Sequence, residues 1–336
     1  MKKYSVGIVG IGTVGTELAK VLRQRKFPAR ELRILATRER DEEIAGEKFR
    51  VRNAADPDAF AGLDVVLFAG TEGAKGASRL YGWHAVKQGA VVIDNGDDYR
   101  MDPRVPLVIP EINPEALKNH NGLIANPNCS TIIALMALAP LHRAVRVRRF
   151  VVSTYQSVSG TGRNAILELE QQTREYVAGR PFTVKEYKHR IAFNVLPQVG
   201  SFKPELDGST TEELKMLNET RKILGDRRIR VASTCVRVPV FRGHSEALNI
   251  EFEKPVSPEQ ARGILSRAPG VRVVDHPASA KYPLPIDIAG RDDVAVGRIR
   301  ADTSVRNGLA LFVAGDNIRK GAALNAVQIA ELLLLG

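Results

Sequence analysis

One of the two cysteines lies where a thiol could act as a nucleophile. Cys129 falls within Ala125-Asn-Pro-Asn-Cys-Ser-Thr131, immediately before an apolar run that predicts a helix. The free backbone N–H groups of a helix N-terminus favour a thiolate and could also hold a developing oxyanion. A lone cysteine is more often a small buried hydrophobic residue. The polar loop and the helix start favour a reactive thiol here.

A glycine-rich turn near the N-terminus could bind a dinucleotide. The segment Gly10-Ile-Gly12-Thr-Val-Gly15 follows a predicted strand and opens a predicted helix, which is the setting of a dinucleotide-binding fingerprint. Gly10 permits the tight turn, Gly12 lets the backbone approach a pyrophosphate, and Gly15 lets helix and strand pack closely. A glycine turn without a ligand is the alternative, and the strand–helix–strand context favours the cofactor.

The end of the second predicted strand indicates which dinucleotide is used. An NAD site has an acidic residue about 20 residues after the glycines, where it binds a ribose 2′-hydroxyl. Here the strand ends at Ala36 and is followed by Thr37 and Arg38. A hydroxyl and a guanidinium suit a 2′-phosphate, so we predict NADP rather than NAD. The alternative is that Arg38 is one of many exposed arginines.

A reactive cysteine and a nicotinamide site together indicate one chemistry. The thiolate attacks an aldehyde, a hydride leaves to the cofactor, and an acyl thioester remains. Phosphate then converts the thioester to an acyl phosphate, and the reverse reaction reduces an acyl phosphate to an aldehyde. We therefore predict a phosphorylating aldehyde dehydrogenase.

The first third of the chain alternates short apolar strands with helical stretches, which is typical of an α/β fold with a doubly wound (Rossmann-like) parallel sheet. The predicted strands are Ser5–Val9, Leu32–Ala36, Asp64–Phe68, Val91–Asp94 and a further Leu107–Ile109, and the predicted helices are Val14–Lys26 and Ala77–Lys87. We assign residues 1–128, with a C-terminal helix in 317–336, to an NADP-binding domain.

After residue 128 the strict alternation stops, which indicates an α+β domain with an antiparallel or mixed sheet. The predicted helices are Thr131–Ala139, Ala165–Val177 and Glu212–Leu224, and the predicted strands are Arg149–Thr154, Ile229–Val240, Ala247–Glu253, Val294–Ala301 and Ala310–Ala314. We assign residues 129–316 to a catalytic and dimerisation domain.

Charge is the unusual feature of the composition. The chain has 49 Lys and Arg against 38 Asp and Glu, a net charge of +11, which suits nucleic acid, anionic membranes or anionic small molecules. We see no helix-turn-helix, zinc-finger or RNP-like motif, and the basic residues are spread along the chain, so we predict no nucleic-acid partner. The last apolar run, Ala322–Leu335, is too short to span a bilayer, so we predict no membrane partner either.

The cysteines restrict the compartment and the metals. Cys129 and Cys235 are far apart and neither belongs to a CxxC pair. A disulfide scaffold and a zinc ribbon are therefore disfavoured, and we predict a cytoplasmic protein without a bound metal.

The residues around these motifs resemble the bacterial type of aspartate-semialdehyde dehydrogenase over nearly the whole chain. The most specific blocks are Ile124-Ala-Asn-Pro-Asn-Cys-Ser-Thr131, Thr154-Tyr-Gln-Ser-Val-Ser-Gly160, Glu212-Glu-Leu-Lys-Met216, Arg237-Val-Pro-Val-Phe-Arg-Gly-His-Ser-Glu-Ala247 and Val313-Ala-Gly-Asp-Asn-Ile-Arg-Lys-Gly-Ala-Ala323. Several blocks in the right order are far more specific than any one of them.

The resemblance implies an activity: the interconversion of L-aspartate 4-semialdehyde and inorganic phosphate with L-4-aspartyl phosphate. It implies NADP as cofactor, a place in lysine, threonine and methionine biosynthesis, and a homodimer. By resemblance, Cys129 is the nucleophile, His244 the general acid/base and Gln156 the residue that orients the substrate. Substrate and phosphate ligands are Arg237 for the carboxylate, Glu212 for the amino group, and Arg100 and Lys215 for phosphate. Cofactor ligands are Gly10, Gly12, Thr13, Val14, Gly15, Thr37, Arg38, Ser159, Gly160 and Asn317.

Two of these roles can also be argued from local patterns. The strand around Arg237 alternates, which predicts that Arg237 lies on a polar face opposite the core, where its fork could hold a carboxylate. Glu212 and Lys215 are three residues apart and share a helix face, although a solvated ion pair explains them equally well. Three loops depart from the family pattern, namely the shorter Gly10–Gly15 turn, Phe68–Lys75, and Asp94–Arg100.

Other functions stay open beside this one. A second enzymatic interpretation is another phosphorylating aldehyde dehydrogenase, similar to N-acetylglutamyl-phosphate reductase. A catalytically inactive relative that serves as a scaffold is disfavoured, because Cys129, Gln156, Arg237 and His244 are all present.

Overall fold

A computed structural model describes residues 2–70 and 76–336. The chain forms two compact units: the first comprises Met1–Asn128 and Ala322–Gly336, and the second Cys129–Gly321. From the sequence we predict residues 317–321 in the first domain, whereas in the structure these residues are part of the second unit. Residues 71–75, which make up most of the departing segment Phe68–Lys75, lie outside the described residues.

The first unit is built on a seven-stranded sheet in the order β3-β4-β2-β1-β5-β6-β7. The strands are β1 (Tyr4–Val9), β2 (Ala29–Ala36), β3 (Arg40–Ile44), β4 (Glu47–Asn53), β5 (Val65–Phe68), β6 (Val91–Asp94) and β7 (Leu123–Ala125). All neighbours run parallel except β3 and β4. The order reverses at β1, and ligands of such sheets bind at the carboxyl ends of the strands beside this reversal.

The antiparallel pair β3–β4 was not predicted. Its residues are mostly charged and partly exposed, so they carry no clear apolar alternation. The pair forms because Ala45 and Gly46 both have positive φ values, 54° and 84°, which close a tight two-residue hairpin turn. The predicted strand Leu107–Ile109 is absent, and only an isolated parallel bridge joins Leu107 to Ala125.

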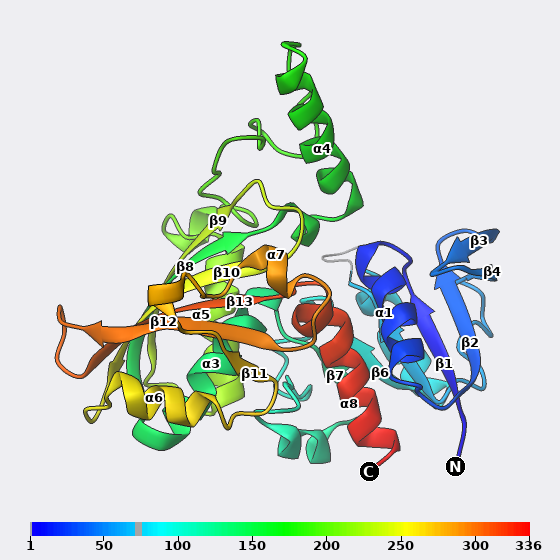
Figure 1. Ribbon diagram of the computed structural model, residues 1–336. Coiled ribbons are helices and arrows are strands. Elements are labelled where there is room, and N and C mark those ends of the chain that lie inside the picture. Colours follow the sequence, from blue (N-terminus) through cyan, green and yellow to red (C-terminus); the bar gives the residue numbers. More distant parts are fainter. Residues whose placement is uncertain (1, 71–75) are drawn as a thin grey trace. The chain divides into compact units, whose positions relative to one another are not determined.

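Helices cover the first sheet. These are α1 (Thr13–Gln24), α2 (Ala77–Lys87) and α8 (Leu324–Leu334), with a 3-10 turn η1 (Pro114–Asn119). Apolar residues of α1 and α8 share one core with Val6 and Ile8 of β1. Helix α2 packs against β5, β6 and β7 and contributes no residue to that core. The C-terminal helix thus completes the unit that the N-terminal strands begin (Figure 1).

The second unit contains a mixed six-stranded sheet in the order β11-β12-β13-β10-β8-β9. The strands are β8 (Val147–Gln156), β9 (Arg230–Arg237), β10 (His244–Phe252), β11 (Val271–Val273), β12 (Val294–Asp302) and β13 (Gly308–Gly315). Strand β10 pairs antiparallel with both β8 and β13, whereas β8 and β9 run parallel. The predicted α+β domain with a mixed sheet is confirmed.

One face of this sheet carries helices. They include α3 (Cys129–Val145), α5 (Thr211–Leu224) and α6 (Pro258–Leu265); α3 packs against α5, α6 and the central strands. Helix α5 begins with a capping box between Thr210 and Glu213. The remaining elements are α4 (Arg163–Val177), α7 (Pro285–Ile288), the 3-10 turns η2 (Val158–Gly160), η3 (Pro204–Leu206) and η4 (Pro277–Ser279), and the π-helical turn η5 (Arg319–Ala323). Figure 1 shows α4 extending away from the sheet of this unit.

Candidate active site

Cys129 is the first residue of α3 and is partly exposed. Its Sγ therefore sits in the first helical turn, where backbone N–H groups favour a thiolate. Cys235 contrasts with it, because that residue is fully buried on β9 and burial raises the pKa of its thiol. Of the two thiols, that of Cys129 is partly exposed and that of Cys235 is buried.

The backbone of the π-helical turn η5 comes very close to Cys129. A Cβ added to Gly321 would lie 2.9 Å from the Cβ of Cys129 and 3.3 Å from its Cα. These atoms belong to the helix start and cannot swing away as the end of a long side chain can. The lack of a side chain at Gly321 therefore allows the turn to lie this close to Cys129.

Gly321→Ala is expected to lower kcat about 10- to 100-fold while the protein stays folded, because a small displacement of a nucleophile is costly. Gly263→Ala in α6 is the matched control, since its Cβ would meet nothing closer than 3.7 Å. That control should keep full activity. Steady-state turnover and the thermal midpoint of both variants check this, and a fully active Gly321→Ala protein contradicts the close approach.

Three predicted functional side chains come from neighbouring strands of the second sheet. Gln156 at the end of β8 is paired with Arg237 at the end of β9. Since Ser245 pairs with Tyr155, His244 at the start of β10 reaches the same end of the sheet. All three side chains are buried. The sheet thus brings an amide, a guanidinium and an imidazole together in one row.

Gln156 joins this row to helices α3 and α5. Its Nε2 donates to Oγ of Ser130, the residue after Cys129, and to Oε1 of Glu212 at 3.1 Å. Its Oε1 is buried and has no hydrogen-bond partner among the described residues. Glu212 also lies 3.8 Å from Nζ of Lys215, and both side chains are largely buried. The Glu212–Lys215 pair therefore lies beside Gln156 and is not a solvated surface pair.

Arg237 corrects one sequence prediction. The alternation along β9 is as expected, but the face shared by Cys235 and Arg237 is the buried one. Arg237 is only 6% exposed, because α5 covers this face of β9. The Nη1 atom of Arg237 donates to the backbone oxygen of Ser157 at 2.7 Å, and its Nε has no partner in the part of the chain that the structure describes. A buried guanidinium with a spare N–H group suits an anionic ligand.

His244 is almost fully buried, and its two ring nitrogens have different surroundings. Nδ1 lies 3.1 Å from the backbone nitrogen and 3.1 Å from Oγ of Ser157. Nε2 is buried without a hydrogen-bond partner in residues 2–70 and 76–336. Burial, followed by the charge of Arg237, holds the pKa of His244 well below its usual value. The ring is therefore neutral at physiological pH.

A second polar row lies directly behind the first. Glu246 is two residues after His244 on β10 and pairs with Thr154, which in turn pairs with Cys235. Glu246 is fully buried, and burial, with Glu212 as a smaller cause, raises its pKa well above the usual value. Glu246 belongs to no motif of the sequence, although its spacing of two from His244 places both on one strand face.

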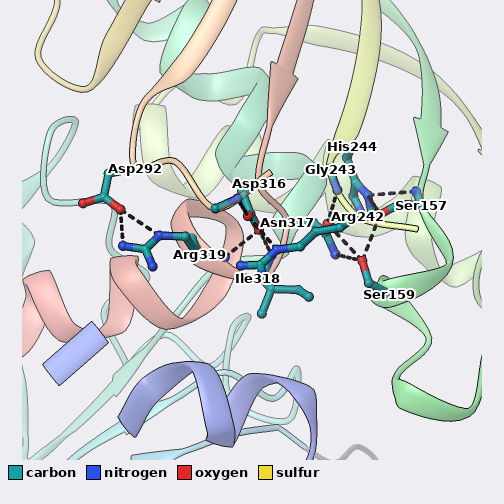
Figure 2. A network of polar contacts seen from close by, with 11 residues as sticks. Ser157, Ser159, Arg242, Gly243, His244, Asp292, Asp316, Asn317, Ile318 and Arg319 are labelled. Carbon is teal, nitrogen blue, oxygen red and sulfur yellow. Dashed lines mark hydrogen bonds and ion pairs between the residues drawn. The ribbon is translucent and has the colours of Figure 1, made fainter. Parts of the chain in front are cut away.

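Ser159, Gly160 and Asn317 lie close to His244 in the second unit. Oδ1 of Asn317 accepts from the Gly243 backbone N–H at 3.0 Å and from the hydroxyls of Ser157 and Ser159 (Figure 2). A Cβ on Gly160 would lie 2.9 Å from Nη1 of Arg237 and 3.2 Å from Nε2 of His244. The polar groups of Ser159 and Asn317 thus bond to each other, and their contact with a cofactor stays a prediction.

The predicted cofactor loop lies in the first unit. Gly10 has a φ of +90°, and a Cβ on Gly15 would lie 1.9 Å from the Gly10 oxygen, so neither position accepts a side chain without strain. A Cβ on Gly12 would meet no atom of the described residues within 4 Å, so these residues leave the start of α1 open to a ligand. The Oγ1 of Thr13 is buried without a partner among the described residues, and Val14 follows it in the same turn. These features fit a bound pyrophosphate.

Thr37 and Arg38 are exposed and directly follow β2. Strand β2 is the parallel neighbour of β1, and the Gly10 nitrogen donates to the Leu35 oxygen at 2.8 Å. The two residues therefore lie at the same sheet edge as the glycine loop. Arg100 also belongs to this unit, where it is buried and donates to the backbone oxygens of Asn126 and Asn95. Its contact with phosphate stays a prediction.

Asp94 at the end of β6 is a buried acid that sequence reasoning did not select. Its Oδ1 accepts from the Gly96 backbone N–H at 2.8 Å, and the whole side chain is buried. Burial raises its pKa from 3.8 to about 6. The folded protein therefore holds this proton more tightly than the unfolded chain does. The resulting stabilisation is present below about pH 4 and is lost as pH rises through 6.

Asp94→Asn is expected to gain stability over the wild type between pH 4 and pH 8, by up to about 3 kcal/mol at 1.4 kcal/mol per pKa unit. Urea unfolding followed by the fluorescence of Trp83 checks this, since the single tryptophan lies in α2 of the same unit. Exposed Asp58→Asn serves as the control and should show no such trend. A constant difference between Asp94→Asn and wild type across this range contradicts the raised pKa.

No group of three or more His, Cys, Asp or Glu side chains among the described residues could hold a metal ion. Within the same ranges, no helix is both apolar and long enough to cross a bilayer.

Two family models match the chain in its two units. The model for the NAD-binding domain of semialdehyde dehydrogenases matches residues 5–120, and the model for their dimerisation domain matches residues 138–320. The match in the second unit includes the row of Gln156, Arg237 and His244.

Curated relatives and solved structures agree with these models. Aspartate-semialdehyde dehydrogenase of Aquifex aeolicus is 48% identical over 98% of both chains, and that of Bacillus subtilis is 42% identical over 98% of this chain and 96% of its own. The crystal structure of aspartate semialdehyde dehydrogenase II from Vibrio cholerae has a TM-score of 0.93, is 42% identical and covers 99% of each chain. The chain therefore belongs to the aspartate-semialdehyde dehydrogenase family.

Proposed function

We propose that the chain interconverts L-aspartate 4-semialdehyde and inorganic phosphate with L-4-aspartyl phosphate, using NADP and an acyl thioester on Cys129. This proposal rests mainly on the position of Cys129 at the start of α3. The next residue, Ser130, is bonded to Gln156, which belongs to the row that holds Arg237 and His244. The related Vibrio cholerae enzyme has also been solved complexed with ASA. This set of side chains would suit an aldehyde that carries a carboxylate and an amino group.

Each side chain has a role that follows from its surroundings. The Cys129 thiolate adds to the aldehyde carbon. Arg237 binds the substrate carboxylate through N–H groups that include the spare Nε, and Glu212 binds the amino group. Gln156, tied to Ser130 and Glu212, holds the substrate beside the thiol. Lys215 and Arg100 bind phosphate, which attacks the thioester and releases the thiolate.

NADP is the proposed cofactor, and a bound nicotinamide supplies the acceptor for the hydride of the aldehyde carbon. The open start of α1 at Gly12 and the buried hydroxyl of Thr13 would hold its pyrophosphate. Thr37 and Arg38, exposed at the end of β2, would hold the 2′-phosphate. An acidic residue is absent from these two positions, and this supports NADP over NAD.

We also propose a homodimer formed through the open face of the second sheet. The side chains on this face point away from α3, and they include the aromatic pair Tyr155 and Phe312 with ring centroids 6.1 Å apart. Tyr155 is 41% exposed. Partly exposed aromatic residues on a sheet face are typical of a subunit interface, and the matched model describes a dimerisation domain. Sedimentation of wild type and Phe312→Glu would test this, with a monomeric variant as the expected result.

The activity is tested by following NADP reduction with aspartate semialdehyde in the presence and absence of phosphate or arsenate. We expect reduction that depends on phosphate, and slower reduction with NAD. N-acetylglutamate semialdehyde, assayed in parallel, represents the alternative of a related reductase. Equal or better turnover of that substrate would overturn the proposed specificity.

A further inference from the structure

The guanidinium of Arg237 lies directly against an exposed stretch of backbone. A Cβ on Gly160 would be only 2.9 Å from Nη1 of Arg237, although Arg237 itself is buried. Gly160 and the next residue, Thr161, are both exposed. The surface of the second unit therefore comes very close to a buried cation at these two residues.

Tyr187 lies on the same part of the second unit. Its Oη is 2.9 Å from Oγ1 of Thr161. Its ring packs against the apolar cluster that includes Val158 and Leu196. Leu196 in turn pairs with Arg237 through two backbone hydrogen bonds of 2.9 and 2.8 Å. Tyr187 is therefore in contact with two segments that border Arg237.

The hydroxyl of Tyr187 also lies in the electrostatic field of Arg237. Burial raises the pKa of Tyr187, and the positive charge of Arg237 is the largest of the influences that oppose this rise. The rise prevails, so the phenol is protonated at neutral pH and can donate a hydrogen bond. A phenol and a guanidinium that lie close together are a pair of donors that suits a carboxylate.

The chain on both sides of Tyr187 is held by two buried side chains of α4. Oε2 of Glu168 accepts hydrogen bonds from the backbone N–H groups of residues 185 and 186, at 2.9 and 2.6 Å. Oε1 of Gln172 accepts from those of residues 191 and 192, at 3.1 and 3.0 Å. Helix α4, which extends away from the sheet in Figure 1, thus fixes the segment that carries Tyr187.

The two hydroxyls of Tyr187 and Thr161 have one proton to spare. Each hydroxyl carries one proton, and the bond between them uses only one of the two. Neither oxygen has a further partner among the described residues. When Thr161 donates to Tyr187, the phenol proton is free for an acceptor that enters from the exposed side. Arg237 likewise keeps an Nε–H group without a partner in the described ranges.

We propose that Tyr187 is a second ligand for the substrate carboxylate: its hydroxyl donates to one carboxylate oxygen while Arg237 holds the group. This rests on the proposed function, because it concerns the carboxylate that Arg237 is proposed to bind. The contact involves no covalent step, and it is made equally in the ground state and the transition state. Tyr187 therefore acts on substrate affinity and on the choice between aldehydes with and without a carboxylate.

The first test removes one oxygen atom. Tyr187→Phe is expected to raise KM for aspartate semialdehyde about tenfold and to leave kcat within about twofold, since a hydrogen bond to a charged group is lost from binding alone. 3-Aminopropanal, which lacks the carboxylate, should be used equally well by wild type and variant. Tyr176→Phe, at an exposed tyrosine of α4, is the control and should change neither. An unchanged KM, or an equal loss on both aldehydes, would overturn the proposal.

A second variant separates contact with the substrate from support of the loop. Thr161→Val breaks the bond to Tyr187 but leaves the phenol in place. We expect its KM for aspartate semialdehyde to stay within about threefold of wild type, and the double variant to behave as Tyr187→Phe does. A rise in KM as large for Thr161→Val as for Tyr187→Phe would mean that Tyr187 acts only through Thr161, which contradicts a direct contact.

A third measurement needs no turnover. 3-Bromopropanoate and 3-bromopropanamide alkylate a thiol at the same carbon and differ in the charge of the end group. Peptide mass spectrometry gives the rate of alkylation of Cys129 by each reagent. We expect wild type to react faster with the carboxylate reagent, and the ratio of the two rates to fall about tenfold in Tyr187→Phe but not in Tyr176→Phe.

This ratio separates failure of the proposal from failure of the proposed function. If aspartate semialdehyde is not turned over but the ratio falls in Tyr187→Phe, the proposed function is wrong and the carboxylate contact of Tyr187 stands. If aspartate semialdehyde is turned over and the ratio is the same in wild type and Tyr187→Phe, only the role of Tyr187 is wrong.

Discussion

Cys129→Ser is expected to lower turnover of aspartate semialdehyde by at least about 10⁴-fold, equivalent to about 5.5 kcal/mol of transition-state stabilisation. The hydroxyl occupies the same place at the start of α3, but it is far less acidic than a thiol and does not ionise there. The loss should therefore be nearly as large for serine as for alanine.

The control for this change is Cys235→Ser. Cys235 is buried on β9, and burial raises the pKa of its thiol, so we expect it to take no part in the reaction. The control should retain turnover even if it loses some stability. NADP binding, measured by fluorescence titration or calorimetry, should persist in Cys129→Ser because the predicted cofactor loop lies in the other unit. Substantial turnover by Cys129→Ser would remove Cys129 as the nucleophile.

Arg237→Lys is expected to reduce kcat/KM for aspartate semialdehyde about 100-fold, although the charge is retained. Lysine cannot form the two parallel hydrogen bonds that a guanidinium forms with a carboxylate, and charge-assisted bonds contribute about 1.5–3 kcal/mol each. Arg237 also donates to the Ser157 oxygen at 2.7 Å, and a lysine must give up that contact or the substrate contact. Steady-state kinetics should show most of the effect in KM.

Two comparisons identify the cause of that loss. Arg230→Lys changes an exposed arginine of the same strand and should leave kcat/KM unaltered. 3-Aminopropanal, which lacks the carboxylate of aspartate semialdehyde, should be a poor substrate for wild type and equally poor for Arg237→Lys. An equal proportional loss on both aldehydes would mean that Arg237 acts on the structure of the site and not on the carboxylate.

Much of the fold follows from short-range patterns. The segment Ala77–Lys87 was predicted with the bounds observed for α2, and the strand Val91–Asp94 matches β6. Helix α3 was predicted near Cys129 from Pro127 and the apolar run that follows. Such elements are determined by local periodicity and capping, which are visible in the sequence. Hairpin β3–β4 was missed because its charged strands depend on a turn of positive φ and on pairing with β2.

The candidate site could be predicted from the sequence only in part. The residue types at Cys129, Gln156 and His244 could be chosen from motifs, whereas the face on which Arg237 lies could not. Alternation tells which residues share a face, but only packing against α5 decides which face is buried. The contact between Nδ1 of His244 and the backbone N–H of Ser157 is further from the sequence, since the two residues lie 87 positions apart.

Trapping the acyl thioester tests the central claim most directly. Wild type is mixed with aspartate semialdehyde and NADP without phosphate, quenched in acid, and examined by intact-mass and peptide mass spectrometry. We predict one equivalent of NADPH, formed in a burst, and an aspartyl adduct on the peptide that contains Cys129, both lost in Cys129→Ser, with the adduct also lost when phosphate is present during the incubation. A burst without an adduct, or an adduct on any other residue, would contradict catalysis through Cys129.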